Sequence, residues 1–88
     1  MTKGVFISKR IQNKMEESET FRDEFYTLVG KYFIRDWGDT CKSDKKLNDE
    51  AIKTKDRVVA LYKTSEGKVF GITEYGHEIT TFIFADEY

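Results

Sequence analysis

Few side chains in this 88-residue chain could do chemistry, and their spacing forms no familiar catalytic pattern. The single histidine, His77, and the single cysteine, Cys41, could act as a nucleophile and base pair only if the fold joined a turn to a loop. No second histidine or cysteine exists to complete a zinc site. No nucleophile elbow or glycine-rich phosphate loop occurs either. The sequence therefore favours a non-enzymatic protein without cofactor or metal.

Two carboxylates flank the only tryptophan in the segment RDWGDT. Gly38 permits a turn there, and Asp36 and Asp39 can accept hydrogen bonds from nearby backbone N–H groups. One interpretation is a structural turn that buries Trp37 in the core, and this interpretation is favoured. The other is a binding loop in which the indole anchors a partner, as tryptophan often does at interfaces. Two carboxylates without further ligands make a poor metal site.

The chain's last third, residues 57–88, predicts three short β-strands joined by two tight turns. Val58, Ala60 and Tyr62 alternate with Val59 and Leu61, as a strand with two apolar faces requires. A four-residue loop, 64–67, and a second turn with Gly76 as its left-handed residue separate the strands. We expect helices to cover one face of this antiparallel meander, about 57–84. The N-terminal segment or a partner should cover part of the other face.

Two main helices are predicted to pack with the meander, which gives an α+β fold in a single domain, 1–88. The first spans about 20–33, begins at a capping box of Thr20 and Asp23, and carries one apolar face. The second spans about 43–53, begins at Ser43, and carries a narrow apolar face of Leu47 and Ala51, with Ile52 as a further candidate. Three possibilities remain for residues 1–13: a short strand, an extended arm or a helix. Residues 14–19 fit one helical turn.

The overall composition limits the classes of partner. The net charge of −1 does not suggest a general nucleic-acid binder or an acidic DNA mimic. Lysines in the middle of the chain alternate with acids, so direct nucleic-acid binding is possible but not favoured. No apolar run is long enough to span a membrane, and we expect no secretion signal. A lone cysteine fits a reducing, cytoplasmic compartment.

Several short motifs occur along the chain: Asp36-Trp37-Gly38-Asp39, Asn48 with Ala51, Ile72-Thr73-Glu74, Thr80-Thr81 and Glu87-Tyr88. Together they resemble a family of small proteins of unknown function carried on bacterial plasmids and other mobile elements. Some members are labelled type I restriction subunits, a role for which 88 residues are too few. Arg35, Ala85-Asp86 and Tyr75-Gly76-His77 depart from the family pattern.

The resemblance implies a setting in mobile DNA of a bacterial host. There we expect a protein-binding module that inhibits a host nuclease complex by occlusion, as anti-CRISPR proteins do. The alternative is a nucleic-acid-associated regulator of element maintenance, and homodimers are compatible with both. Acidic residues would stand in for phosphates, with aromatic anchors beside them. The candidate binding residues are Asp36, Trp37, Asp39, Glu74, Tyr75, His77, Glu78, Asp86, Glu87 and Tyr88.

Overall fold

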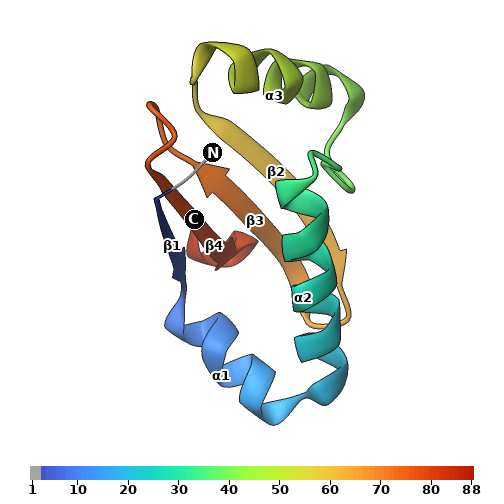
Figure 1. Ribbon diagram of the computed structural model, residues 1–88. Coiled ribbons are helices and arrows are strands. Elements are labelled where there is room, and N and C mark those ends of the chain that lie inside the picture. Colours follow the sequence, from blue (N-terminus) through green and yellow to red (C-terminus); the bar gives the residue numbers. More distant parts are fainter. Residues whose placement is uncertain (1–2) are drawn as a thin grey trace.

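The computed structural model describes residues 3–88, and its fold is α+β, as the sequence predicts (Figure 1). Met1 and Thr2, the start of the N-terminal segment discussed above, lie outside the described residues. The helices and strands within residues 3–88 are β1 (Gly4–Ile7), α1 (Lys9–Glu17), α2 (Glu19–Phe33), α3 (Lys42–Thr54), β2 (Val58–Thr64), β3 (Gly67–Thr73), β4 (Ile79–Phe84) and the 3-10 turn η1 (Ala85–Glu87).

The sheet contains the predicted meander and one strand more. Its order is β1-β4-β3-β2, in which β2, β3 and β4 pair antiparallel and β1 pairs parallel to β4. The prediction of a three-stranded antiparallel sheet was therefore incomplete. The short apolar segment Val5-Phe6-Ile7 gives no sign in the sequence of which strand it will join. The first hairpin is also tighter than predicted, since only Ser65 and Glu66 separate β2 from β3.

The helices differ from the prediction mainly at their N-terminal ends. The hydroxyl of Ser18 caps α2 by accepting a hydrogen bond from the N–H of Phe21, so the predicted capping box at Thr20 was wrong. Cys41, and not Ser43, precedes the first residue of α3. An additional helix, α1, follows β1 and is capped by Ser8. Strand and helix thus both occur in the N-terminal segment, where they were considered as competing possibilities.

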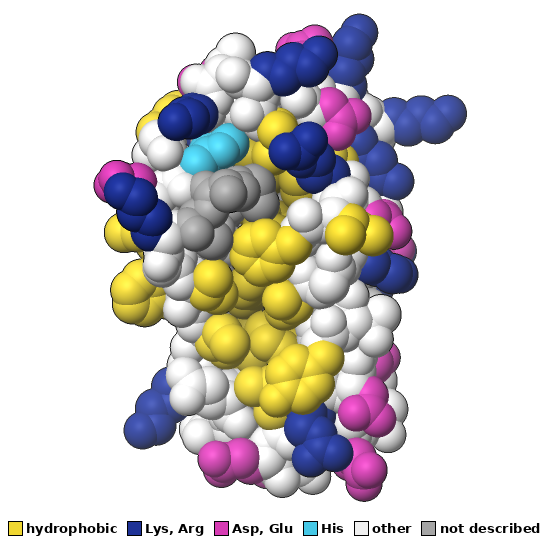
Figure 2. All heavy atoms as spheres, in the orientation of Figure 1, with side chains coloured by type: hydrophobic (Ala, Val, Ile, Leu, Met, Phe, Trp, Pro, Cys, Tyr) yellow, Lys and Arg dark blue, Asp and Glu magenta, His cyan; other side chains and the backbone are white. Residues whose placement is uncertain are grey.

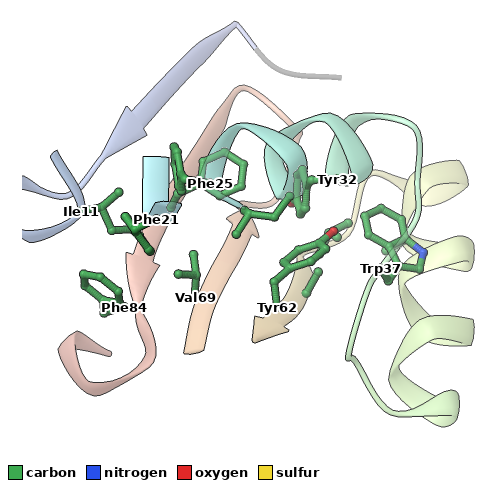
Figure 3. Close-up of a cluster of buried hydrophobic side chains, with 13 residues drawn as sticks. Ile11, Phe21, Phe25, Tyr32, Trp37, Tyr62, Val69 and Phe84 are labelled. Carbon is green, nitrogen blue, oxygen red and sulfur yellow. The ribbon is translucent and has the colours of Figure 1, made fainter. Parts of the chain in front are cut away.

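One face of the sheet forms the core with α2 (Figure 3). Phe21, Phe25 and Tyr32 are almost completely buried, and the Phe25 and Tyr32 rings meet Phe82 of β4 edge to face, at 5.6 and 5.3 Å between centroids. Gly71 of β3 makes room for this contact, because a Cβ there would lie 2.8 Å from the Tyr32 ring. Ring-on-ring packing of this kind buries a large area with few residues, as a short chain requires.

The C-terminal segment, and not the N-terminal one, folds over the opposite face of the sheet. The Tyr88 ring lies against Phe70 at 5.5 Å between centroids, and the hydroxyl accepts a hydrogen bond from Arg57. The N-terminal segment instead extends the sheet at its edge as β1. Among residues 3–88, no helix combines the length and the hydropathy that crossing a bilayer would demand.

Candidate protein-binding surface

Trp37 belongs to the core, as the favoured interpretation predicted. Its side chain is 3 % exposed, and its ring meets Tyr32 edge to face at 5.5 Å. The indole N–H donates a hydrogen bond of 2.8 Å to Asp49 of α3. Because both the ring and its polar atom are occupied, Trp37 cannot anchor a partner in this conformation, so it holds α3 and α2 together instead.

The carboxylates beside Trp37 hold the loop against the edge of β2. Asp36 accepts the N–H of Gly38 at 3.1 Å in the predicted Asx turn, and Asp39 accepts the N–H of Lys63 in β2 at 2.8 Å. Gly38 has φ 60°, and a Cβ there would lie 2.4 Å from the Tyr62 ring, so only glycine fits. The RDWGDT segment is therefore explained by its structural contacts.

The turn between β3 and β4 holds four of the predicted site residues. His77 lies in this turn but is only 7 % exposed, with Nε2 2.7 Å from the carbonyl oxygen of Asp56. Its φ of 58° adds a second left-handed residue after Gly76. Glu78 lies 3.6 Å from the ammonium of Lys3. Tyr75, at 72 % exposure, is the one large ring that this turn offers to solvent.

The C-terminal candidates are held by two arginines. Arg10 of α1 makes two hydrogen bonds to Asp86, of 2.7 and 3.2 Å, and lies 3.6 Å from Glu87. The hydrogen bond from Arg10 lowers the pKa of the Asp86 carboxyl. Arg57 donates to the hydroxyl of Tyr88 at 2.7 Å and to Glu74 at 2.9 Å, and these contacts raise the pKa of its guanidinium.

The predicted site residues therefore occupy three places and do not form one surface. Arg57 brings the second turn and the C-terminus together through Glu74 and Tyr88, whereas the Trp37 loop lies against the edge of β2. Each of their carboxylates already accepts a hydrogen bond or faces a cation. These carboxylates are Asp36, Asp39, Glu74, Glu78, Asp86 and Glu87.

A different surface stands out on the α2 side of the molecule. Figure 2 shows hydrophobic side chains in a band between the positions that β1 and α2 occupy in Figure 1. Val5 is 47 % exposed, Tyr26 62 % and Phe33 38 %, while Ile7 and Val29 are partly buried. Pairing with Thr80 and Phe82 turns Val5 and Ile7 of β1 toward the α2 side. We call these five residues the α2–β1 band.

Sequence reasoning missed the band because it sought a single apolar face on the helix. Tyr26, Val29 and Phe33 fall at i, i+3 and i+7, beside the buried row that contains Phe25 and Tyr32. The apolar arc of α2 is therefore wider than the sheet beneath it can cover. A count of both rows would have revealed a helix with more apolar surface than one core contact needs.

Two of the surface hollows lie beside α2 and beside α3. The first, of about 630 Å³, is open, and its polar rim mixes Asp23, Glu24 and Lys31 of α2 with Asp39 and Lys63. Another, of about 450 Å³, is mostly apolar and lies between α3 and the outer face of β2 and β3. Within residues 3–88, no group of three or more histidine, cysteine or acidic side chains could hold a metal ion.

Comparison with known proteins adds no relative. No family model, no curated protein and no solved structure matches this chain.

Proposed function

We propose that the chain is a small non-enzymatic module that binds another protein through the α2–β1 band. The observation that carries the proposal is the exposure of Val5, Tyr26 and Phe33 on a molecule whose other large rings are mostly packed. Contiguous apolar patches on a folded domain commonly mark interaction sites. Tyrosine and phenylalanine are also enriched where interfaces bury their centres.

The proposed mechanism is occlusion of a partner surface by a rigid domain. The aromatic core and the ion pairs at both ends of the chain support rigidity, which lowers the entropy lost on binding. The resemblance to mobile-element proteins favours a host nuclease complex as the partner, with inhibition as the result. Binding would then resemble that of an anti-CRISPR protein, with apolar contacts contributing more than imitation of phosphate.

Site-specific photo-crosslinking tests the proposal. A benzophenone amino acid is introduced at Tyr26 in the band, at Tyr75 in the second turn, and at Lys46 on the exposed side of α3. We expect one host protein to crosslink from Tyr26 and not from Lys46. The purified partner should then lose affinity for a Tyr26→Ala, Phe33→Ala variant by at least about tenfold, since two interface aromatics are removed.

The position of the crosslink decides the surface. If the partner is captured from Tyr75 alone, or if the double alanine variant binds as tightly as the unmodified chain, the band is not the binding site. A circular dichroism spectrum of each variant controls for loss of fold. Inhibition of the captured partner's nuclease activity, if it has one, tests the occlusion mechanism directly.

A second candidate function is the nucleic-acid-associated regulator, which one observation favours. Lys42, Lys46 and Lys53 fall at i, i+4 and i+11 on α3, are exposed, and make no ion pair within residues 3–88. Dark-blue side chains gather around this end of the molecule in Figure 2. Arg35 and Lys55 border a hollow of about 420 Å³ close by. A cluster of unpaired cations is the usual footprint of phosphate binding.

Salt dependence separates the two functions. Binding of single- or double-stranded DNA through α3 should weaken steeply as salt rises. A Lys42→Glu, Lys46→Glu variant should abolish it, while Tyr26→Ala should leave it unchanged. Absence of binding to DNA and RNA at low salt would eliminate this candidate.

A further inference from the structure

At the outer edge of β1, some backbone groups have no partner within residues 3–88. The N–H groups of Gly4 and Ser8 donate to Glu78 and Phe82, so the alternate residues Val5 and Ile7 turn their N–H and C=O away from β4. The side chain of Gln12 reaches the Ile7 carbonyl at 2.7 Å. Neither the N–H nor the C=O of Val5 has a partner among residues 3–88.

The side chains of β1 do not protect this edge. Val5 is 47 % exposed on the α2 side and Phe6 is 58 % exposed on the opposite side. Natural edge strands usually carry an inward charge, a proline or a bulge that prevents pairing with another chain. The strand Gly4–Ile7, with the sequence GVFI, has no charge and no proline.

We propose that this edge binds a second copy of the chain, with the two β1 strands antiparallel and Val5 on the two-fold axis. A residue with both its donor and its acceptor free can exchange two hydrogen bonds with its own copy, as an isologous contact requires. A longer foreign strand gains little more, because the next outward carbonyl, that of Ile7, is already used. The net charge of −1 gives little repulsion between copies.

The resulting dimer has one continuous sheet with both α2 helices on the same side. Paired residues of adjacent strands share a face, so Val5 of each copy lies on the side of the α2–β1 band. The two bands then adjoin across the axis and form a larger apolar surface. Dimerisation does not depend on the proposed host partner, so either inference can fail alone.

Sedimentation velocity over a concentration series tests the dimer, with Val5→Pro as the decisive variant. Proline has no N–H, so both hydrogen bonds across the axis are lost, while those from Gly4 and Ser8 to β4 remain. Val5→Thr is the matched control, because it keeps the N–H and the β-branched shape. The contact is small, so we expect a dissociation constant between about 10 μM and 1 mM.

The mass of the unmodified chain should rise from 10.4 kDa toward twice that value as concentration increases. Val5→Thr should behave alike, and Val5→Pro should raise the dissociation constant by at least about tenfold. Unmodified protein that remains a monomer at about 1 mM overturns the proposal. So does a dimer that Val5→Pro leaves intact, since its contact must then lie elsewhere.

Disulfide trapping tests the register in a Cys41→Ser background, which removes the exposed native thiol. Val5→Cys places the two Cα atoms about 5.5 Å apart across the axis, within the range that a disulfide spans. Phe6→Cys is the control, since position 6 faces position 4 of the copy and its own counterpart lies beyond about 7 Å. Equal crosslinking from both positions would exclude the proposed register.

Discussion

The two edges of the sheet differ in whether their outward backbone groups have hydrogen-bond partners. At β2 the RDWGDT loop and α3 satisfy the outward N–H and C=O groups of Val59 and Leu61 and the N–H of Lys63. Asn48 bonds both the N–H and the C=O of Val59, at 3.3 and 2.8 Å. Thr40 accepts the N–H of Leu61 at 2.9 Å. At β1 the corresponding groups of Val5 have no partner among residues 3–88.

Polar side chains therefore satisfy the backbone at the edge of β2 and leave Val5 at the edge of β1 unpaired within residues 3–88. An unpaired strand edge favours pairing with other chains, so a covered edge limits association on that side. The open edge lies beside the α2–β1 band, so backbone and apolar groups are available on the same side of the molecule. We therefore expect substitutions at the β2 edge to change stability and substitutions at β1 to change association.

The largest effect is expected from Trp37→Ala, which empties the contact beneath the covered edge. Loss of a buried tryptophan of this kind costs about 3–5 kcal/mol of unfolding free energy. Trp37→Phe should retain part of the packing and lose the hydrogen bond to Asp49. Urea unfolding followed by circular dichroism measures both. Tyr75→Ala, at 72 % exposure, is the control, and a similar loss there would show that Trp37 has no special role.

The next largest loss of stability is expected from Asn48→Ala, compared with Leu47→Ala at the neighbouring position of α3. Asn48→Ala leaves two backbone groups of Val59 without their partner, for a loss of about 2–3 kcal/mol. Leu47→Ala removes a side chain that is 61 % exposed, so the loss should stay under about 0.5 kcal/mol. The same denaturation experiment compares them. A larger loss of unfolding free energy for Leu47→Ala than for Asn48→Ala would show that Leu47 packs in the predicted apolar face. It would also contradict the role of Asn48 in satisfying the edge of β2.

The third effect is a loss of folding stability at alkaline pH, through the buried hydroxyls of Tyr32 and Tyr62. Burial raises the pKa of Tyr32 to about 12, and it also raises the pKa of Tyr62, whose hydroxyl donates to the Asp36 carbonyl. The unfolded chain releases these protons near pH 10, so stability is intact below about pH 10 and falls as pH rises toward 12. For Tyr32 alone the loss is about 1.4 kcal/mol at about pH 11.

Urea unfolding between about pH 8 and pH 11 measures this slope. Tyr32→Phe should reduce the slope, because the replacement has no proton to release. The variant's lower stability at neutral pH, where it lacks the hydrogen bond to Thr73, serves as its own baseline. A slope that Tyr32→Phe and Tyr62→Phe both leave unchanged would contradict the assignment.

The smallest stability effect is expected at the open edge. Val5→Thr should change the unfolding free energy by less than about 0.5 kcal/mol, since the side chain is half exposed. Amide hydrogen exchange at low protein concentration gives the sharper comparison. The Val5 amide should exchange rapidly and the Leu61 amide slowly, because Thr40 holds the latter. Strong protection of Val5 in the monomer would show that the edge is covered.

The sequence predicted elements well where periodicity and turn chemistry agree. Alternation in residues 57–84, with glycines at both turns, identified β2, β3 and β4, and the apolar face predicted over about 20–33 identified α2. Prediction was poorer for caps and for the face of α3. Ser18 and Thr20 are both suitable N-cap residues two positions apart, and nothing in the local sequence shows which of them caps α2. Asn48 is buried because the edge of β2 lies opposite it.

The sequence alone determined the α+β class and the antiparallel meander, and it favoured a structural role for the Trp37 turn. These depend on local periods and on residues such as Gly38 whose conformational needs are local. Only the tertiary structure decided that β1 joins β4 in parallel, that His77 is buried, and that the carboxylates of the three predicted groups are held by internal partners. The physical reason is that burial and charge pairing depend on residues distant in sequence, such as Arg10 and Asp86, which only folding brings together.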